Sequence, residues 1–179
     1  LEVETPVLVD IPAGGRAIPF ETFHESLEKK LFLRIATELH LKKLIVGGIE
    51  KVYEIGRLFR NEGIDHDHNP EFTTMESYES FEDYNTVMIM VENLVSTVAK
   101  EVNGSTKIKI SEDVYIDLEP PWDRLDLRES IIANTGIDFL KSKNSIDLAS
   151  IMVSKGFVAD PKEAWGILLD RLILASLFR

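Results

Sequence analysis

The sequence contains no cysteine among its 179 residues. This absence excludes disulfide bonds and thiolate metal sites, and it is compatible with a reducing compartment. Long hydrophobic runs are also missing. The longest candidate, residues 167–178, is interrupted by Asp170 and Arg171 and falls short of the roughly 20 apolar residues that span a bilayer. The start, Leu-Glu-Val-Glu, lacks the basic region of a signal peptide. We therefore expect a soluble, cytoplasmic protein with no membrane segment.

Basic residues are in the minority, with 20 Lys and Arg against 31 Asp and Glu and a formal net charge of -11. Proteins that bind nucleic acids usually carry a basic surface, so this balance argues against a surface devoted to the phosphate backbone. It leaves room for a local basic patch, or for an RNA contact made by another domain. The remaining composition, 44% hydrophobic and 28% charged, is typical of a globular protein.

Local patterns predict one α+β domain over residues 1–179, with a mainly antiparallel sheet flanked by helices. Alternating or short apolar runs predict strands at residues 1–9, 31–35, 52–62, 71–80, 107–110 and 114–118. Helical spacing and end signals predict helices at residues 38–46, 83–103, 130–134, 146–155 and 161–178. Thr37 is the expected cap of the first helix, and Asp160-Pro161 the expected start of the last. The helix at 83–103 is indicated by Val87, Val91, Leu94, Val98 and Val102, which fall at spacings of four, three, four and four.

The strands at 52–62 and 71–80 predict a hairpin with an unusual set of side chains. Because side chains alternate between the faces of a strand, Leu58, Arg60 and Glu62 should share one face. On the second strand, the residues that share a face are Phe72, Thr74, Glu76 and Tyr78. An arginine, two glutamates and two aromatic rings on faces that can coincide suit the lining of a pocket better than a hydrophobic core.

Three stretches carry a resemblance to a known family. Residues 59–63 read Phe-Arg-Asn-Glu-Gly, and residues 68–76 read His-Asn-Pro-Glu-Phe-Thr-Thr-Met-Glu. Together they resemble motif 2 of the class II aminoacyl-tRNA synthetases, and among these the lysine-specific members. Residues 1–6, Leu-Glu-Val-Glu-Thr-Pro, resemble the end of motif 1. The similarity is dense over residues 1–104 and looser beyond.

The resemblance implies an ATP site on this hairpin. Arg60 is expected to contact the α-phosphate, and a guanidinium can hold phosphate oxygens in a bidentate way. Glu62 is expected to accept from the adenine amino group, and Phe72 to stack on the adenine. His68, with its neighbour Asn69, is expected near the terminal phosphates.

The resemblance also implies a site for L-lysine. Glu38 is expected to hold the α-amino group, with Gly14 allowing a close approach of the backbone. Glu76 and Tyr78 are expected to line the pocket for the aliphatic chain and the ε-amino group. A buried ammonium group is costly without a partner, so an acidic pocket is physically required.

Less specific interpretations exist for each of these residues. An arginine and a glutamate two positions apart on a strand commonly form a surface ion pair, and Phe72 and Tyr78 could be core residues. His66-Asp67-His68 could be a metal site, although a His-x-His in a loop usually is not. We expect no metal site within this chain.

The sequence also departs from the family pattern. The glycine-rich run of motif 3 does not occur, although Leu169-Asp170-Arg171 echoes its last residues. Ile18 stands where the family commonly has arginine, which questions how the Gly14 loop closes over substrate, and Thr37 stands where proline is usual. The chain is therefore expected to be an incomplete catalytic domain. The ligands of Mg²⁺ and the anticodon-binding OB-fold should lie outside it, and the chain alone should be inactive.

The expected activity is the ligation of lysine to tRNA(Lys) by way of lysyl-adenylate, in a full-length homodimer. Two alternatives remain open. One is the paralogue that attaches lysine to elongation factor P. The other is a non-catalytic binding module derived from a synthetase.

Overall fold

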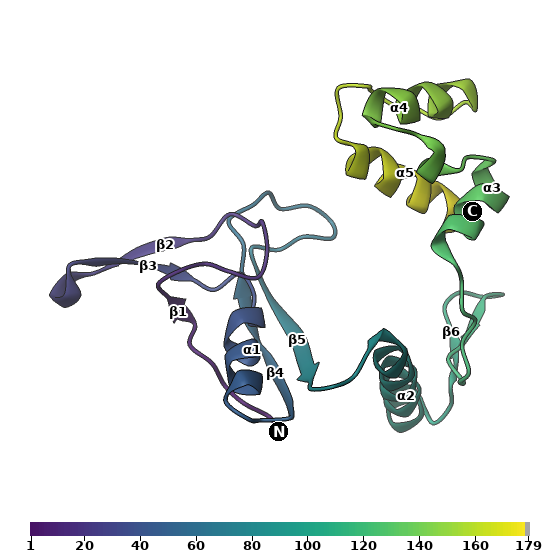
Figure 1. The fold of residues 1–179 in the computed structure, drawn as a ribbon. Helices are drawn as coiled ribbons and strands as arrows, with labels where there is room; N and C mark the ends of the chain where they lie inside the picture. The colour runs from purple at the N-terminus through teal and green to yellow at the C-terminus, as the bar shows by residue number, and fades with distance from the viewer. Residues whose placement is uncertain (178–179) are drawn as a thin grey trace. The chain divides into compact units, whose positions relative to one another are not determined.

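The computed structural model describes residues 1–177, which fall into two compact units, Leu1–Met90 and the residues from Val91 onward (Figure 1). Each unit combines helices with a small antiparallel sheet or hairpin. The predicted α+β class, with antiparallel pairing, is confirmed. The prediction of a single domain over residues 1–179 stays a prediction.

The first unit contains a three-stranded sheet in the order β1-β3-β2, formed by Leu8–Val9, Lys29–Leu33 and Glu21–His24. A 3-10 turn, η1 (Glu25–Leu27), joins β2 to β3. The predicted strand over residues 1–9 is wrong in its length, because only Leu8 and Val9 pair with β3. Pro6 has no N–H to donate to a ladder, which is consistent with this interruption. Upstream of it, Glu2 forms a parallel bridge with Tyr53.

The predicted hairpin forms from β4 (Lys51–Phe59) and β5 (Glu71–Glu79), paired from Lys51 opposite Glu79 to Phe59 opposite Glu71. The expectation that the first strand continues to Glu62 is wrong, because the ladder ends at Phe59. Beyond it, the Arg60 N–H donates to the Pro70 carbonyl at 2.8 Å and the Asn61 N–H donates to the Ile18 carbonyl at 2.7 Å. Residues 60–62 therefore leave the strand and turn toward the loop of residues 11–20.

Helix α1 (Glu38–Val46) packs against β4 and β5 and has the predicted bounds (Figure 1). Thr37 occupies the N-cap position, but its side chain makes no capping hydrogen bond, contrary to the prediction. Its backbone N–H instead donates to Glu76 Oε1 on β5 at 3.2 Å. This bond fixes the start of α1 against the hairpin.

A buried ion pair connects Arg34 to Glu54 on β4 of the hairpin. Arg34 and Glu54 are 4% and 2% exposed, and Nη1 of Arg34 lies 2.5 Å from Oε1 of Glu54. Thr5 donates its hydroxyl to the other oxygen of Glu54 at 2.6 Å, and Arg34 Nε donates to the Arg57 carbonyl at 2.9 Å. Burial by itself would raise the pKa of Glu54, but the bonds from Thr5 and Arg34 bring this pKa below its ordinary value. The pair joins the N-terminal segment, the residue after β3, and β4.

The second unit contains most of α2 (Tyr84–Asn103) and a hairpin of β6 (Lys107–Lys109) with β7 (Tyr115–Asp117). The helices α3 (Leu127–Thr135), α4 (Ser145–Ser154) and α5 (Trp165–Leu177) follow, with a 3-10 turn η2 (Phe139–Lys141). Their core consists of Ile131, Ile137, Phe139, Leu148, Ala149, Met152, Leu168 and Leu172. Helix α5 begins four residues later than predicted, since Asp160 accepts from the Lys162 N–H and forms a separate turn. The predicted end at Phe178 lies outside the described residues.

The helix predicted at 83–103 forms as α2, which begins at Tyr84. The five apolar residues whose spacing indicated this helix are all exposed, from Leu94 at 38% to Val102 at 75%. The buried positions of the helix are Glu92, Ser96 and Ala99. Glu92 forms an ion pair with Arg124 and accepts the Trp122 N–H at 3.0 Å, so the buried face is the one that meets residues 118–124. In residues 1–177, no helix is long and apolar enough to cross a membrane.

Candidate functional site

One cavity brings together all five residues predicted to bind ATP. It has a volume of about 230 Å³ and lies where the end of β4, the loop after it and the start of β5 meet. Its lining consists of Arg60, Glu62, Gly63, Asp67, His68, Asn69 and Phe72. The hairpin turn thus gathers residues that lie up to 12 positions apart in the sequence. Their individual roles toward ATP stay predictions.

Arg60 is held in this cavity without an anionic partner. Its Cζ lies 5.1 Å from the centre of the Phe72 ring, within range of a cation–π contact. Its Nε is buried and makes no hydrogen bond, and Arg60 forms no ion pair within residues 1–177. A buried donor without a partner is costly, so this guanidinium is suited to an anion that enters the cavity.

Glu62 links this cavity to the loop that contains Gly14. Its Oε1 accepts the Ile18 N–H at 3.3 Å, next to the bond from the Asn61 N–H to the Ile18 carbonyl. Both bonds use the backbone of Ile18, and the side chain itself is exposed. The replacement of the usual arginine by Ile18 therefore leaves these two loop contacts intact.

His68 is paired with an acid of its own loop. Its Nδ1 lies 2.7 Å from Oδ1 of Asp65, and the same oxygen accepts the Asp67 N–H at 2.8 Å. The hydrogen bond and charge of Asp65 raise the pKa of His68, while the bond from His68 lowers the pKa of Asp65. This arrangement favours a cationic imidazole at the edge of the cavity.

A metal site is not found in this loop. His66 is exposed and pairs with the adjacent Asp67, at 3.2 Å between Nδ1 and Oδ1. Across the part of the chain that the structure describes, no group of three or more His, Cys, Asp or Glu residues is arranged to hold a metal ion.

The four residues predicted to bind lysine form a second cluster, which we call the acidic cluster and which consists of Gly14, Glu38, Glu76 and Tyr78. Gly14 adopts a φ of +93°, and a Cβ placed on it would lie 2.7 Å from Cβ of Ala36 and 3.0 Å from Cβ of Glu38. Both the conformation and the space therefore require glycine at this position. Burial raises the pKa of Tyr78, and the charges of Glu76 and Glu38 raise it further, which places the phenol close to both carboxylates.

The sequence analysis missed one member of this cluster, Lys42. Its Nζ lies 2.5 Å from Oε1 of Glu38 and 5.8 Å from the centre of the Tyr78 ring. The spacing of four residues between Glu38 and Lys42 on a predicted helix was the available signal, because side chains at i and i+4 share one face.

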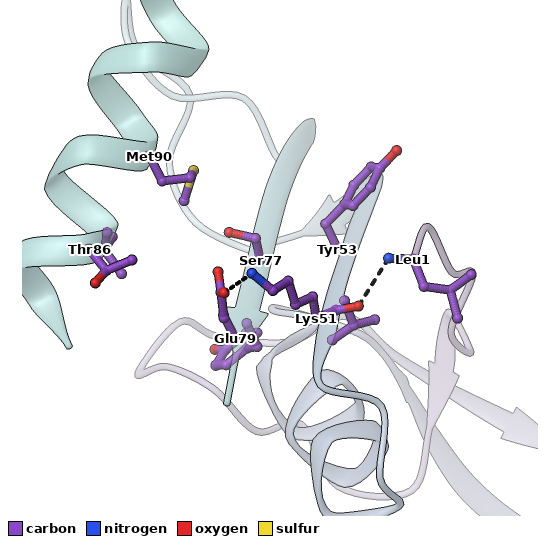
Figure 2. Close-up of a pocket in the computed structure, with 10 residues that line it drawn as sticks. Leu1, Lys51, Tyr53, Ser77, Glu79, Thr86 and Met90 are labelled. Carbon is purple, nitrogen blue, oxygen red and sulfur yellow. Dashed lines mark hydrogen bonds and ion pairs between the residues drawn. The ribbon is translucent and has the colours of Figure 1, made fainter. Parts of the chain in front are cut away.

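Another hollow lies at the opposite end of the hairpin, next to the first turns of α2 (Figure 2). Its volume is about 170 Å³, and Lys51 and Glu79 form an ion pair beside it. Tyr78 is the only predicted site residue in its lining, so it does not correspond to the predicted ATP or lysine site.

Comparison with known proteins shows which proteins this chain is similar to. A lysine–tRNA ligase of Dehalococcoides mccartyi is 47% identical over 173 residues, which cover 97% of this chain and 34% of that protein. A lysine–tRNA ligase of Listeria innocua is 58% identical over 139 residues, or 78% of this chain and 28% of that protein. The relative from Prochlorococcus marinus, also a lysine–tRNA ligase, is 56% identical over the same length.

The chain spans about a third of the length of these curated relatives. Residues 1–161 match the family model of the class II tRNA synthetases for D, K and N, the one-letter symbols for aspartate, lysine and asparagine. The matched residues include the hairpin, the cavity around Arg60 and the cluster around Tyr78. The chain therefore belongs to the class II tRNA synthetases of the D, K and N group.

Proposed function

We propose that this chain is part of a lysine–tRNA ligase. The enzyme activates L-lysine with ATP to give lysyl-adenylate and pyrophosphate, and it then transfers lysine to the 3′ end of tRNA(Lys). The observation that carries this proposal is that Arg60 has no ion-pair partner in residues 1–177. Its Nε is buried and makes no hydrogen bond, and its side chain lines the same cavity as Phe72 and Glu62.

The first step of this reaction explains why an unpaired cation is needed. A carboxylate oxygen of lysine forms a bond to the α-phosphorus of ATP, and the bond from that phosphorus to the oxygen bridging to the β-phosphate breaks. Two anions must approach each other, so positive charge has to be in place before the attack. Arg60 supplies this charge at the α-phosphate, and His68, whose cationic form Asp65 favours, supplies it near the leaving pyrophosphate.

The adenine is held by the remaining residues of the cavity. Phe72 offers a ring face for stacking, and Glu62 keeps one carboxylate oxygen for the adenine amino group while its other oxygen accepts from Ile18. Asn69 lies on the same wall beside His68. Because Glu62 also contacts the Gly14 loop, nucleotide bound here would stabilise the loop that borders the acidic cluster.

The acidic cluster matches the charge of the proposed amino acid. Lysine carries two ammonium groups, and Glu38 and Glu76 provide one carboxylate for each. Aspartate and asparagine, the other amino acids of this family, have no second ammonium group. The names of the relatives support lysine, and they do not favour the paralogue that modifies elongation factor P or a non-catalytic module.

The other components of the proposal concern the whole protein. We place the tRNA(Lys) contacts mainly outside this acidic chain, and the Mg²⁺ ligands mainly outside it as well. We also propose a cytoplasmic homodimer, since residues 1–6 resemble the end of motif 1, which forms the dimer interface in this family. Sedimentation of the whole protein at the mass of one subunit would contradict the dimer.

The test is the amino-acid dependence of ATP–pyrophosphate exchange by the whole protein, because exchange measures adenylate formation without tRNA. Exchange should depend on L-lysine. Exchange that depends on aspartate or asparagine would show that the enzyme belongs to another branch of the family.

A further inference from the structure

The ammonium group of Lys42 lies inside the acidic cluster that the proposed function assigns to substrate lysine. It bonds to Oε1 of Glu38 at 2.5 Å and lies 5.8 Å from the centre of the Tyr78 ring. Hydrogen bonding to Glu38 and the charge of Glu38 raise the pKa of Lys42, and the charges of Tyr78 and Glu76 raise it further. An ammonium group of the chain thus contacts the carboxylate that the substrate needs.

The arrangement is favoured by the local sequence. Glu38 is the first residue of α1, and Lys42 follows it by one turn, so the two side chains lie on the same face of the helix. That face meets β5, because the Thr37 N–H just before the helix donates to Glu76 Oε1. The Lys42 side chain is 54% exposed, so it can exchange its contact with Glu38 for water without unfolding the helix.

We propose that Lys42 is an internal occupant of the lysine site, which holds Glu38 when substrate is absent and is displaced by substrate lysine. Two ammonium groups at the same carboxylate repel each other even in bulk water, so Lys42 and the substrate cannot share Glu38 without cost. Lys42 also balances one of the two carboxylate charges of the empty site. Its release is part of substrate binding and weakens the apparent affinity for lysine.

This inference rests on the proposed function. It predicts the opposite change in the lysine KM from a model in which Lys42 only positions Glu38 for the substrate. If Lys42 only positions Glu38 for the substrate, its removal raises the KM for lysine. If Lys42 competes with the substrate, its removal lowers the KM for lysine. The expected size is about two- to fivefold, the range that corresponds to one exposed ion pair.

The experiment compares three variants of the whole protein, Lys42→Met, Lys42→Arg and Lys43→Met, by lysine-dependent ATP–pyrophosphate exchange. Lys42→Met keeps the length of the side chain without its charge and should lower the lysine KM about two- to fivefold. The ATP KM and kcat should stay at the values of the parent protein. Lys42→Arg keeps the cation and should leave the lysine KM near that of the parent.

Lys43→Met is the matched control for net charge. Lys43 is exposed on the same helix and borders a different hollow, with Pro6 and Leu8, away from the acidic cluster. Its loss should leave the lysine KM unchanged. An unchanged or higher lysine KM in Lys42→Met, or an equal fall in Lys43→Met, would overturn the inference while the parent still uses lysine. A parent protein without lysine-dependent exchange would overturn the proposed function and this inference with it.

Discussion

At the scale of single residues, the hairpin separates two kinds of charge. Arg60 lies in the first cavity with a buried, unbonded Nε, whereas Glu38 and Glu76 lie around Tyr78 in the second cluster. A nucleotide needs the first arrangement and a diamino acid needs the second. Phe72 of the first cavity and Glu76 and Tyr78 of the second cluster all lie on β5, so the proposed substrates can be held in a fixed relation to each other.

Glu76 offers a test of the amino-acid site. In the parent protein, the Thr37 N–H donates to Oε1 of Glu76 at 3.2 Å. Glu76→Gln removes the negative charge but keeps an oxygen that can accept this N–H. We expect the lysine KM to rise by roughly ten- to hundredfold, because loss of a hydrogen bond to a charged group costs about 1.5–3 kcal/mol. Steady-state exchange kinetics should show a much smaller change in the ATP KM. Equal effects on both substrates would contradict the assignment.

The pair of His68 and Asp65 predicts how ATP binding depends on pH. Asp65 raises the pKa of His68 above its ordinary value of 6.5, so the imidazole stays cationic to a higher pH. The ATP KM should rise as the pH increases through this pKa, because the charge that attracts the phosphates is lost. In Asp65→Asn the rise should begin at lower pH, whereas His66→Ala should leave the profile unchanged. Identical pH profiles for the parent and Asp65→Asn would contradict this role.

At the scale of elements, the Arg34–Glu54 pair holds β4 in its place. Its two side chains are buried, and their bonds reach Thr5 in the N-terminal segment and Arg57 on β4. The glycine at position 56 leaves the space that the guanidinium occupies. Strand β4, which leads to Arg60, is therefore held in place by a buried ion pair as well as by apolar packing.

Breaking this pair should be costly. Arg34→Met leaves Glu54 buried without its cation, and we expect the free energy of unfolding to fall by about 3–5 kcal/mol. Urea unfolding of the whole protein should show a clearly lower midpoint. The control is Lys30→Met, which removes the exposed ion pair with Glu21 and should cost about 1 kcal/mol or less. Similar losses in the two variants would contradict the importance of burial.

Much of the first unit could be predicted from the sequence, for identifiable reasons. The alternation in β4 and β5 and the glycines after α1 are local signals, and the structure has the hairpin and the helix where they indicate. The end of β4 could not be predicted, because it depends on a backbone bond between Asn61 and the distant Ile18. Lys42 was missed because an i, i+4 pair on a helix does not reveal that Tyr78 and Glu76 lie beside it.

The α2 helix shows a different limit of the sequence analysis. Its valine spacing correctly predicted a helix, although the valines that gave this signal are exposed. Periodicity identifies an apolar face, while burial depends on which segments are present to cover it. Within the second unit, Glu92 and its partners Trp122 and Arg124 determine the buried side.

At the scale of the whole molecule, the chain spans about a third of the length of its relatives. Its sequence lacks the motif 3 pattern, which in the family supplies a second arginine for ATP. Loss of one preorganised electrostatic contact typically lowers kcat by about 10² to 10³. The 179-residue chain alone should therefore bind nucleotide weakly and make no lysyl-adenylate at a useful rate. Exchange at the rate of the whole protein would contradict this expectation.

The most direct test of the account is the role of Arg60 in adenylate formation by the whole protein. Lysine-dependent ATP–pyrophosphate exchange should be compared for the parent, Arg60→Ala and Arg57→Ala. Arg57 is exposed near the end of β4, three residues before Arg60, and pairs with Glu71, so its replacement controls for the loss of one positive charge near the site. We predict that Arg60→Ala lowers kcat by about 10² to 10³ and that Arg57→Ala stays within about threefold of the parent. Exchange by Arg60→Ala at the rate of the parent would contradict the placement of the ATP site on this hairpin.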